Sequence, residues 1–120
     1  MAYRLTYIYA LSNIPRVIDA LAALGEPNRF AIVELLRDGP LPVNGIVDRL
    51  ELGQPQVSRH LKVLTGAGLV AMEPKAQQRI YHLREQRFRE LDSWLDSFTD
   101  LWAGRFDRLE AHLTRMKDLK

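Results

Sequence analysis

Prolines and glycines divide the first half of this 120-residue chain into short segments, and this division restricts the possible folds more than any other feature. Proline is favoured at the first position of a helix, because the N–H that it lacks would have no partner there. Glycine, alone or before proline, is typical of a helix end. Four prolines each open a segment rich in apolar residues: Pro15, Pro27, Pro42 and Pro55. We therefore expect helices over residues 14–24, from Pro27 to the Gly39–Pro40 pair, over residues 43–50, and from Gln54 to Gly68.

After Gly68 the pattern changes to two short extended segments. Residues 69–73 and 79–83 are strand candidates, and residues 74–78 between them are typical of a hairpin loop. Gly68 stands where a left-handed residue commonly ends a helix, with an apolar contact from the residue that follows. The sequence thus predicts a mainly α fold with a small β-hairpin (α+β), in a single domain that spans residues 1–120.

From about Glu85 a helical pattern runs almost to the C-terminus. Its apolar residues recur at steps of three or four, which predicts one apolar stripe about 38 Å long on one continuous helix. A single small domain does not cover a stripe of this length, and a large exposed apolar patch usually marks an interface. Gly104, in the middle, favours a bend or a close approach of two helices. We expect the N- and C-terminal helices to form a homodimer interface that includes Leu91, Trp94, Leu95, Phe98, Trp102, Phe106, Leu109 and Leu113.

Composition and motifs exclude several classes of protein. The chain has no cysteine, which rules out disulfides, thiolate metal sites and cysteine nucleophiles, and is consistent with a reducing cytoplasm. No apolar run approaches the roughly 20 residues that a membrane-spanning helix needs. The G-x-S-x-G, H-E-x-x-H and G-x-x-x-x-G-K motifs are absent, and the G-x-G-x-x-A string at residues 66–71 ends a helix instead of following a strand. We expect neither an enzyme, nor a membrane protein, nor a cofactor.

The excess positive charge of the chain is concentrated in its middle. Residues 54–83 have a net charge of +3, whereas residues 1–53 sum to −1 and residues 84–120 to zero. A local basic surface is what electrostatic attachment to phosphate requires.

The third and fourth predicted helices, joined by a tight turn at residues 51–54, favour a helix-turn-helix. Val57, Leu61 and Leu64 cluster on one side of the fourth helix and predict its buried face. Arginine can bond guanine and glutamine can bond adenine in the major groove, while serine and lysine can hold phosphate. The side chains that face away from the core carry these groups: Gln56, Arg59 and Lys62, with Ser58 and His60 at the flanks.

Three stretches of the sequence, in this order and spacing, resemble the ArsR family of winged helix-turn-helix transcriptional repressors: LGEPNRFAIVELL, LGQPQVSRHLKVLTGAGLV and RIYHL. The resemblance covers residues 17–83 and is most specific at residues 54–62. It implies a dimeric cytoplasmic protein that binds an imperfect inverted repeat in a promoter and blocks transcription. Residues 13–83 would then be the DNA-binding core and residues 85–120 the dimerisation helix. On the DNA it places Gln54, Gln56, Ser58, Arg59, His60 and Lys62 of the recognition helix, together with a wing at residues 73–79 that carries Lys75 and Arg79.

The sequence also departs from the metal-sensing members of this family. Those members carry a Cys-x-Cys pair at the start of the helix that precedes the recognition helix, where this chain has Pro42 and Asn44. Others bind zinc through the last helix, where this chain has His112 but Arg115 three residues later. The tail WLDSFTDLWAGRFDRLEAHL resembles a metal-independent branch, and we expect no metal site.

Two alternatives remain open from the sequence. A small organic effector could bind between the terminal helices near Trp94 and Trp102 and control DNA binding. The winged helix could instead be a protein-interaction module with no role on DNA.

Overall fold

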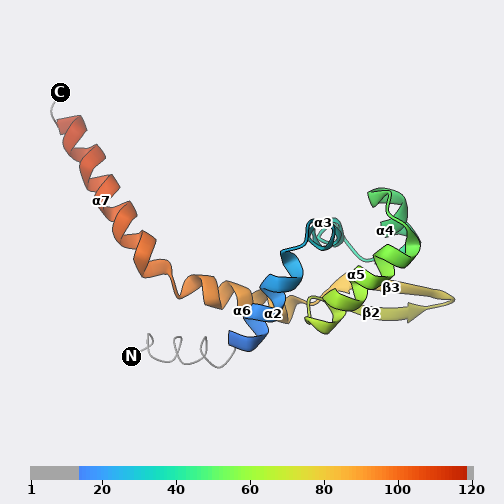
Figure 1. Cartoon of the computed structure of the whole chain (residues 1–120). Coiled ribbons are helices and arrows are strands. Elements are labelled where there is room, and N and C mark those ends of the chain that lie inside the picture. The colour runs from blue at the N-terminus through green and yellow to red at the C-terminus, as the bar shows by residue number, and fades with distance from the viewer. Residues whose placement is uncertain (1–13, 119–120) are drawn as a thin grey trace.

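The computed structural model describes residues 14–118, apart from the side chains of residues 100, 102, 105 and 106. Figure 1 shows a body of packed helices with a β-hairpin projecting at one end and a long helix at the other. The elements in chain order are α2 (Ile14–Leu24), α3 (Pro27–Leu36), β1 (Leu41–Pro42), α4 (Val43–Leu50), α5 (Gln54–Gly66), β2 (Val70–Lys75), β3 (Gln78–Leu83), α6 (Glu85–Asp96) and α7 (Thr99–Asp118). The mainly α fold with a small β-hairpin is confirmed.

The core lies where α2, α3, α4 and α5 meet the base of the hairpin and the start of α6. Its largest fully buried side chains are Ile32, Ile46, Leu61, Leu64, Leu69, Val57 and Val70. Small residues of α2, such as Ala20 and Ala23, are also buried and let that helix pack closely on its neighbours. This core fixes the position of α5 from one side.

Helix ends are set by local hydrogen bonds that the prolines and glycines indicate only in part. Glu26 caps α3, because its carboxylate accepts a 2.8 Å hydrogen bond from the N–H of Arg29. Gly68 has φ of +77° and ends the α5 segment, as predicted. Glu51, with φ of 56°, ends α4 and turns the chain toward α5.

The three strands form one antiparallel sheet in the order β1-β3-β2. The hairpin is longer than the sequence predicted: Pro74 pairs with Arg79 and Lys75 with Gln78, so the connection shrinks to Ala76 and Gln77. Ala76 adopts the left-handed conformation, φ 56°, that such a tight turn requires. The short strand β1, which pairs with Tyr81 and Ile80, was not predicted, because two residues carry no detectable alternation.

The C-terminal segment is two helices, and the prediction of one continuous helix is wrong. The hydroxyl of Ser97 donates to the carbonyl of Trp94, and the hydroxyl of Thr99 donates to Asp96. The Ser97 bond to a backbone carbonyl is of the kind that competes with the helical ladder, and both bonds accompany a break at residues 97–98. The break divides the apolar stripe between α6, which packs on α2, and α7.

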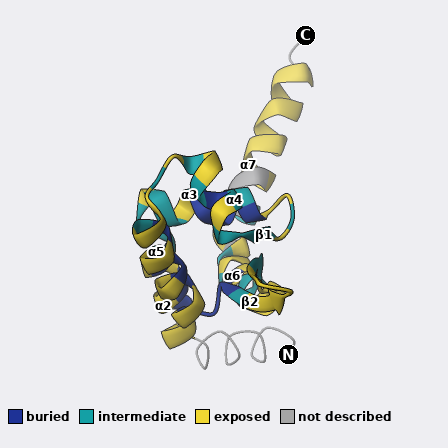
Figure 2. Cartoon of the chain, turned by 90° about the vertical axis from the view of Figure 1, so that its right-hand side faces the viewer, coloured by how far each residue is buried: buried dark blue, intermediate teal, exposed yellow. Residues whose placement is uncertain are grey.

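Helix α7 extends away from the body (Figure 2), and residues 107–118 are all exposed. Within the described residues, no helix is long and apolar enough to span a bilayer.

Candidate nucleic-acid interface

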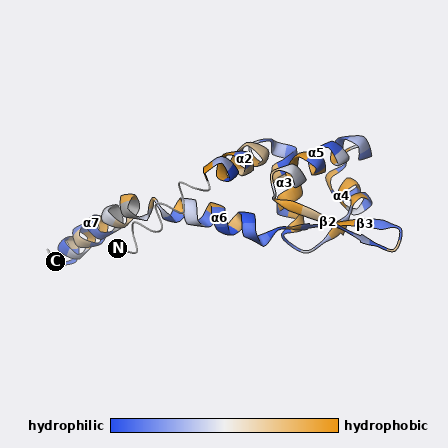
Figure 3. Ribbon diagram, turned by 90° about the horizontal axis from the view of Figure 1, so that it is seen from below, coloured by the Kyte–Doolittle hydropathy of each residue, from blue (hydrophilic) through white to orange (hydrophobic). Residues whose placement is uncertain are grey.

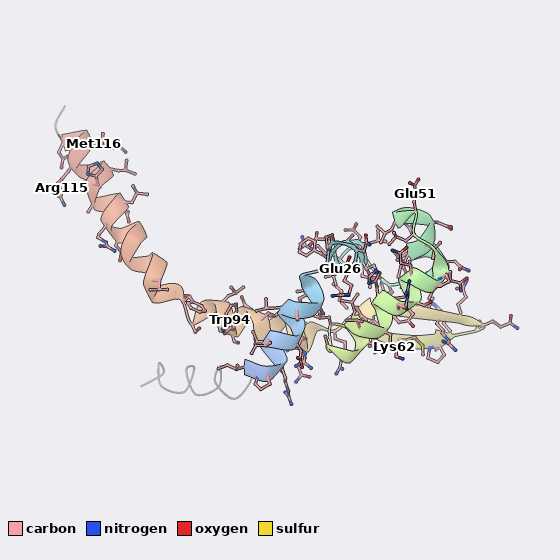
Figure 4. The ribbon with its side chains drawn as sticks, viewed as in Figure 1. Glu26, Glu51, Lys62, Trp94, Arg115 and Met116 are labelled. Carbon is pink, nitrogen blue, oxygen red and sulfur yellow. The ribbon has the colours of Figure 1, made fainter. Side chains whose placement is uncertain are left out.

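Helix α5 presents one polar, positively charged face to solvent. Val57, Leu61 and Leu64 make its buried side, each no more than 1% exposed, as their spacing predicted. Within the described residues, no ion pair joins Arg59 or Lys62 to an acidic side chain. The exposed side contains Gln54, Ser58, Arg59 and Lys62, the last labelled in Figure 4. These donors are therefore available to an external partner.

The N-terminus of α5 is open to an anion. Its N-cap, Gly53, makes no side-chain capping bond, and its first turn carries no acidic residue. The backbone N–H groups of a first helical turn and the positive end of the helix dipole favour a phosphate group. The backbone N–H groups and the absence of an acidic side chain therefore both favour an anion at the N-terminus of α5.

Gln56 and His60 lie at the edges of this face, half-buried. The imidazole Nδ1 of His60 is 3.8 Å from Glu26, and its side chain is 16% exposed, so the ring leans toward the start of α3. Figure 4 labels Glu26 there. His60 consequently reaches less far from the helix than Arg59 does.

The hairpin forms the wing and projects beyond α5 (Figures 1 and 3). Lys75 and Arg79 are both exposed near its tip. Directly paired residues share a face of a β-ladder, so Lys75 lies with Gln78 on one face and Arg79 with Pro74 on the other. Glu73 is 3.4 Å from His82 across the strands. The two cations therefore extend the basic surface of α5 in two directions.

A second surface is apolar and lies away from α5. On α2, Ile14, Ile18 and Leu21 are 37%, 58% and 42% exposed. Large apolar side chains on α6 and α7 are about half exposed: Leu95, Leu101, Leu109, Leu113 and Met116. Figure 3 shows hydrophobic residues mixed with hydrophilic ones along α7.

Two residues predicted for the dimer interface pack against the protein's own core. Leu91 is 8% exposed and belongs to the core of its own chain, which leaves little of its surface for a partner. Trp94 packs partly against the same core and contacts Phe98 edge-on, with ring centroids 5.2 Å apart. Trp102 and Phe106 have side chains outside the described residues.

The sequence has clear relatives. The profile described as bacterial regulatory protein, arsR family, matches residues 26–71. The chain is 42% identical to the HTH-type transcriptional regulator Rv2034 of Mycobacterium tuberculosis over 79 residues, which make up 66% of this chain and 74% of that protein. This chain belongs to the ArsR family.

The fold agrees with this membership. A crystal structure of a possible transcriptional regulator for arsenical resistance matches this ArsR-family chain with a TM-score of 0.62 and 36% identity, over 78% of this chain and 95% of that one. The transcriptional repressor SmtB of M. tuberculosis is 38% identical over 73 residues, 61% of this chain and 54% of its own length. The chain is therefore a DNA-binding transcriptional regulator with a winged helix-turn-helix fold, and not an enzyme.

The residues of this ArsR-family protein do not fit the cysteine metal site known from some members. Pro42 lies in β1 and is the N-cap of α4, and Asn44 lies in the first turn of α4. Neither side chain is a thiolate. Among the described residues, no group of three or more His, Cys, Asp or Glu side chains is arranged to hold a metal ion.

The sequence did not predict the charged cluster formed by Glu90, Arg16 and Arg87. Glu90 is 3% exposed, and its two carboxylate oxygens accept hydrogen bonds from Arg16 and Arg87. Arg16 is 74 residues away from Glu90 along the chain, so no local sequence spacing predicts their contact. The only sequence signal was the i, i+3 spacing of Arg87 and Glu90 on one helix face.

Proposed function

We propose that this protein is a transcriptional repressor that binds an inverted-repeat operator as a homodimer, with α5 in the major groove. The observation that carries the proposal is the exposed face of α5, polar and basic opposite the buried Val57, Leu61 and Leu64. Base edges in the major groove are read by such side chains on a recognition helix. Repression is the activity named for the relative SmtB.

The DNA-binding residues fall into sets according to whether each contacts bases or phosphates. Arg59 and Gln56 read base edges, because their side chains can bond bidentately to guanine and to adenine. Gln54, Ser58 and His60 adjust the register of the helix. Phosphates are neutralised by Lys62, Lys75 and Arg79, which are all exposed.

The homodimer rests on the unpartnered apolar faces of α2 and α7. Ile18 is 58% exposed and Leu101 is 61% exposed, and residues 107–118 contact no other part of the described chain closely enough to be covered. Association of two such faces would remove this apolar surface from water. A two-fold pair then presents α5 twice, and half-sites about 34 Å apart follow from one turn of DNA.

The protein lacks both the cysteine metal site and, with Arg115 three residues after His112, the zinc site of the last helix, and we place it among the metal-independent members of the family. Pro42 and Asn44 at the cysteine positions support this assignment. As a repressor it acts in the cytoplasm, where the DNA is.

A gel-shift experiment with the purified protein and the DNA upstream of its own gene, at two salt concentrations, tests the proposal. We expect a shift that weakens at the higher salt and is lost for a scrambled duplex. The control variant is Arg89→Ala, which removes an exposed arginine of α6 that pairs with Glu85. It should bind the DNA as the wild type does. No shift at either salt concentration would favour a protein-interaction module instead.

A reporter gene under the same upstream DNA fixes the direction of regulation. We expect expression to rise when the regulator is deleted. A fall in expression would show that the protein activates transcription and would contradict the proposal that it is a repressor.

A further inference from the structure

A polar cavity lies where α2, the end of α5 and the start of α6 meet. Its volume is about 160 Å³, and it is lined by Arg16, Gly68, Arg84, Gln86, Arg87 and Glu90. Figure 1 shows α2 crossing α6 in this region, on the far side of α5 from the tip of the wing. We propose that this cavity binds a small oxyanion, such as phosphate or a short carboxylic acid, and that its occupancy alters DNA binding.

The charge of the lining favours an anion. Three arginines face one carboxylate, Glu90, which already accepts hydrogen bonds from Arg16 at 3.3 Å and from Arg87 at 2.6 Å. Within the described residues, the side chain of the third arginine, Arg84, makes no hydrogen bond or ion pair with an acidic residue. The lining therefore keeps an excess of positive charge, and guanidinium groups bind oxyanions with paired hydrogen bonds.

Backbone geometry adds to this charge. Arg84 is the N-cap of α6 and makes no side-chain capping bond, so the first N–H groups of the helix are not satisfied by a cap. Gln86 and Arg87 belong to that first turn and line the cavity. The one acidic residue of that turn, Glu85, pairs with Arg89 and does not line the cavity. The positive end of the α6 dipole and three arginines thus border one space.

The size of the cavity limits the ligand. About 160 Å³ is close to the volume of an engineered protein cavity that admits benzene, roughly 150 Å³. A single phosphate, a sulfate or a short carboxylic acid fits such a space.

The cavity is linked to α5 through Arg87. Its Nε donates a 3.0 Å hydrogen bond to the carbonyl of Ala67, the C-cap residue of α5. Gly68 then lies directly against the guanidinium, which a Cβ at this position would displace. An anion that draws on Arg87 therefore acts at the end of the helix that carries Arg59, and this part of the inference rests on the proposed function.

Calorimetric titration of the DNA-free protein tests the site, with inorganic phosphate, sulfate and succinate as probes and chloride at matched ionic strength as the reference. We expect saturable binding of at least one oxyanion and none of chloride. Arg84→Gln should weaken it by about tenfold or more, because a charge-assisted hydrogen bond is lost. Since the Arg84 side chain is exposed and makes no hydrogen bond or ion pair within the described residues, and its backbone bond to Leu69 does not depend on the side chain, this variant should fold normally.

Arg89→Gln is the matched control, because Arg89 lies on the same helix but pairs with Glu85 outside the cavity lining. It should leave anion binding unchanged. Equal binding of chloride and oxyanions, or equal losses in the Arg84 and Arg89 variants, would mean an adventitious surface ion and would overturn the site.

The link to α5 is tested separately, by measuring the Kd for the upstream duplex of the gel-shift experiment with and without saturating anion at constant ionic strength. We expect a shift of several-fold in the wild type and none in Arg84→Gln. Binding of the anion with no shift would overturn the link. Because the first titration contains no DNA, failure of the proposed DNA binding cannot be mistaken for failure of the anion site.

Discussion

Arg59 is the side chain on which base recognition by α5 most depends. It is exposed and pairs with no acidic residue among those described, so its guanidinium is available to a guanine. We predict that Arg59→Ala weakens operator binding by about 1–3 kcal/mol and relaxes the preference at one base position in each half-site. Titration of single-base operator variants measures both effects. A variant with unchanged base preference would remove Arg59 from this role.

Gly68 is the residue at which the backbone most requires glycine. Its φ of +77° is unfavourable for other residues, and a Cβ would overlap the guanidinium of Arg87. We predict that Gly68→Ala lowers the free energy of unfolding by roughly 1–3 kcal/mol, measured by urea denaturation at fixed protein concentration.

Gly66→Ala is the control for this substitution, since a Cβ there meets no atom within 4 Å. In a helical position it should be neutral or stabilise by up to about 1 kcal/mol. Equal effects of the two substitutions would show that the strain at Gly68 is absent.

Single residues were predictable from sequence where their role is local. The buried side of α5 and the left-handed Gly68 follow from spacing within a few residues, and both are confirmed. The burial of Glu90, the core position of Leu91 and the approach of His60 to Glu26 arise from packing between helices. No local sequence pattern predicts these three features.

At the scale of elements, α7 is the helix whose apolar residues are least covered by contacts within its own protomer. Leu109 and Leu113 lie one turn apart and are 53% and 51% exposed. We predict that Leu109→Asp destabilises the dimer by roughly 3 kcal/mol or more, because both protomers lose a buried leucine, which raises the dimer Kd over about 100-fold. Sedimentation equilibrium measures the association.

Ala111→Asp is the matched control, because Ala111 lies about 200° around the helix from Leu109. It adds the same charge to the opposite face and should leave the dimer intact. Dissociation by both substitutions, or by neither, would contradict an interface on the Leu109 face.

Element boundaries were predictable where proline or glycine sets them, and uncertain elsewhere. The starts of α3, α4 and α5 agree with the sequence within a residue or two. The break between α6 and α7 coincides with hydroxyl hydrogen bonds at Ser97 and Thr99, and neither the charge pattern nor the apolar spacing changes there. For that reason the apolar periodicity alone predicted one helix.

For the whole molecule, the basic surface predicts how strongly binding depends on salt. If Lys62, Lys75 and Arg79 each neutralise one phosphate, a dimer neutralises about six, and log K should fall with log salt at a slope on the order of −5. Removing Lys75 should reduce the slope by about two, one phosphate for each protomer. Affinities measured between 50 and 200 mM salt give this slope, and one near zero would contradict a phosphate-bound wing.

The most direct test of the account is selection of binding sites from a randomised duplex by the purified protein. A two-fold dimer that reads bases with α5 should enrich an inverted repeat whose half-sites are centred about one helical turn, 10–10.5 base pairs, apart. Enrichment of a single unrepeated motif, or of no motif at all, would contradict it.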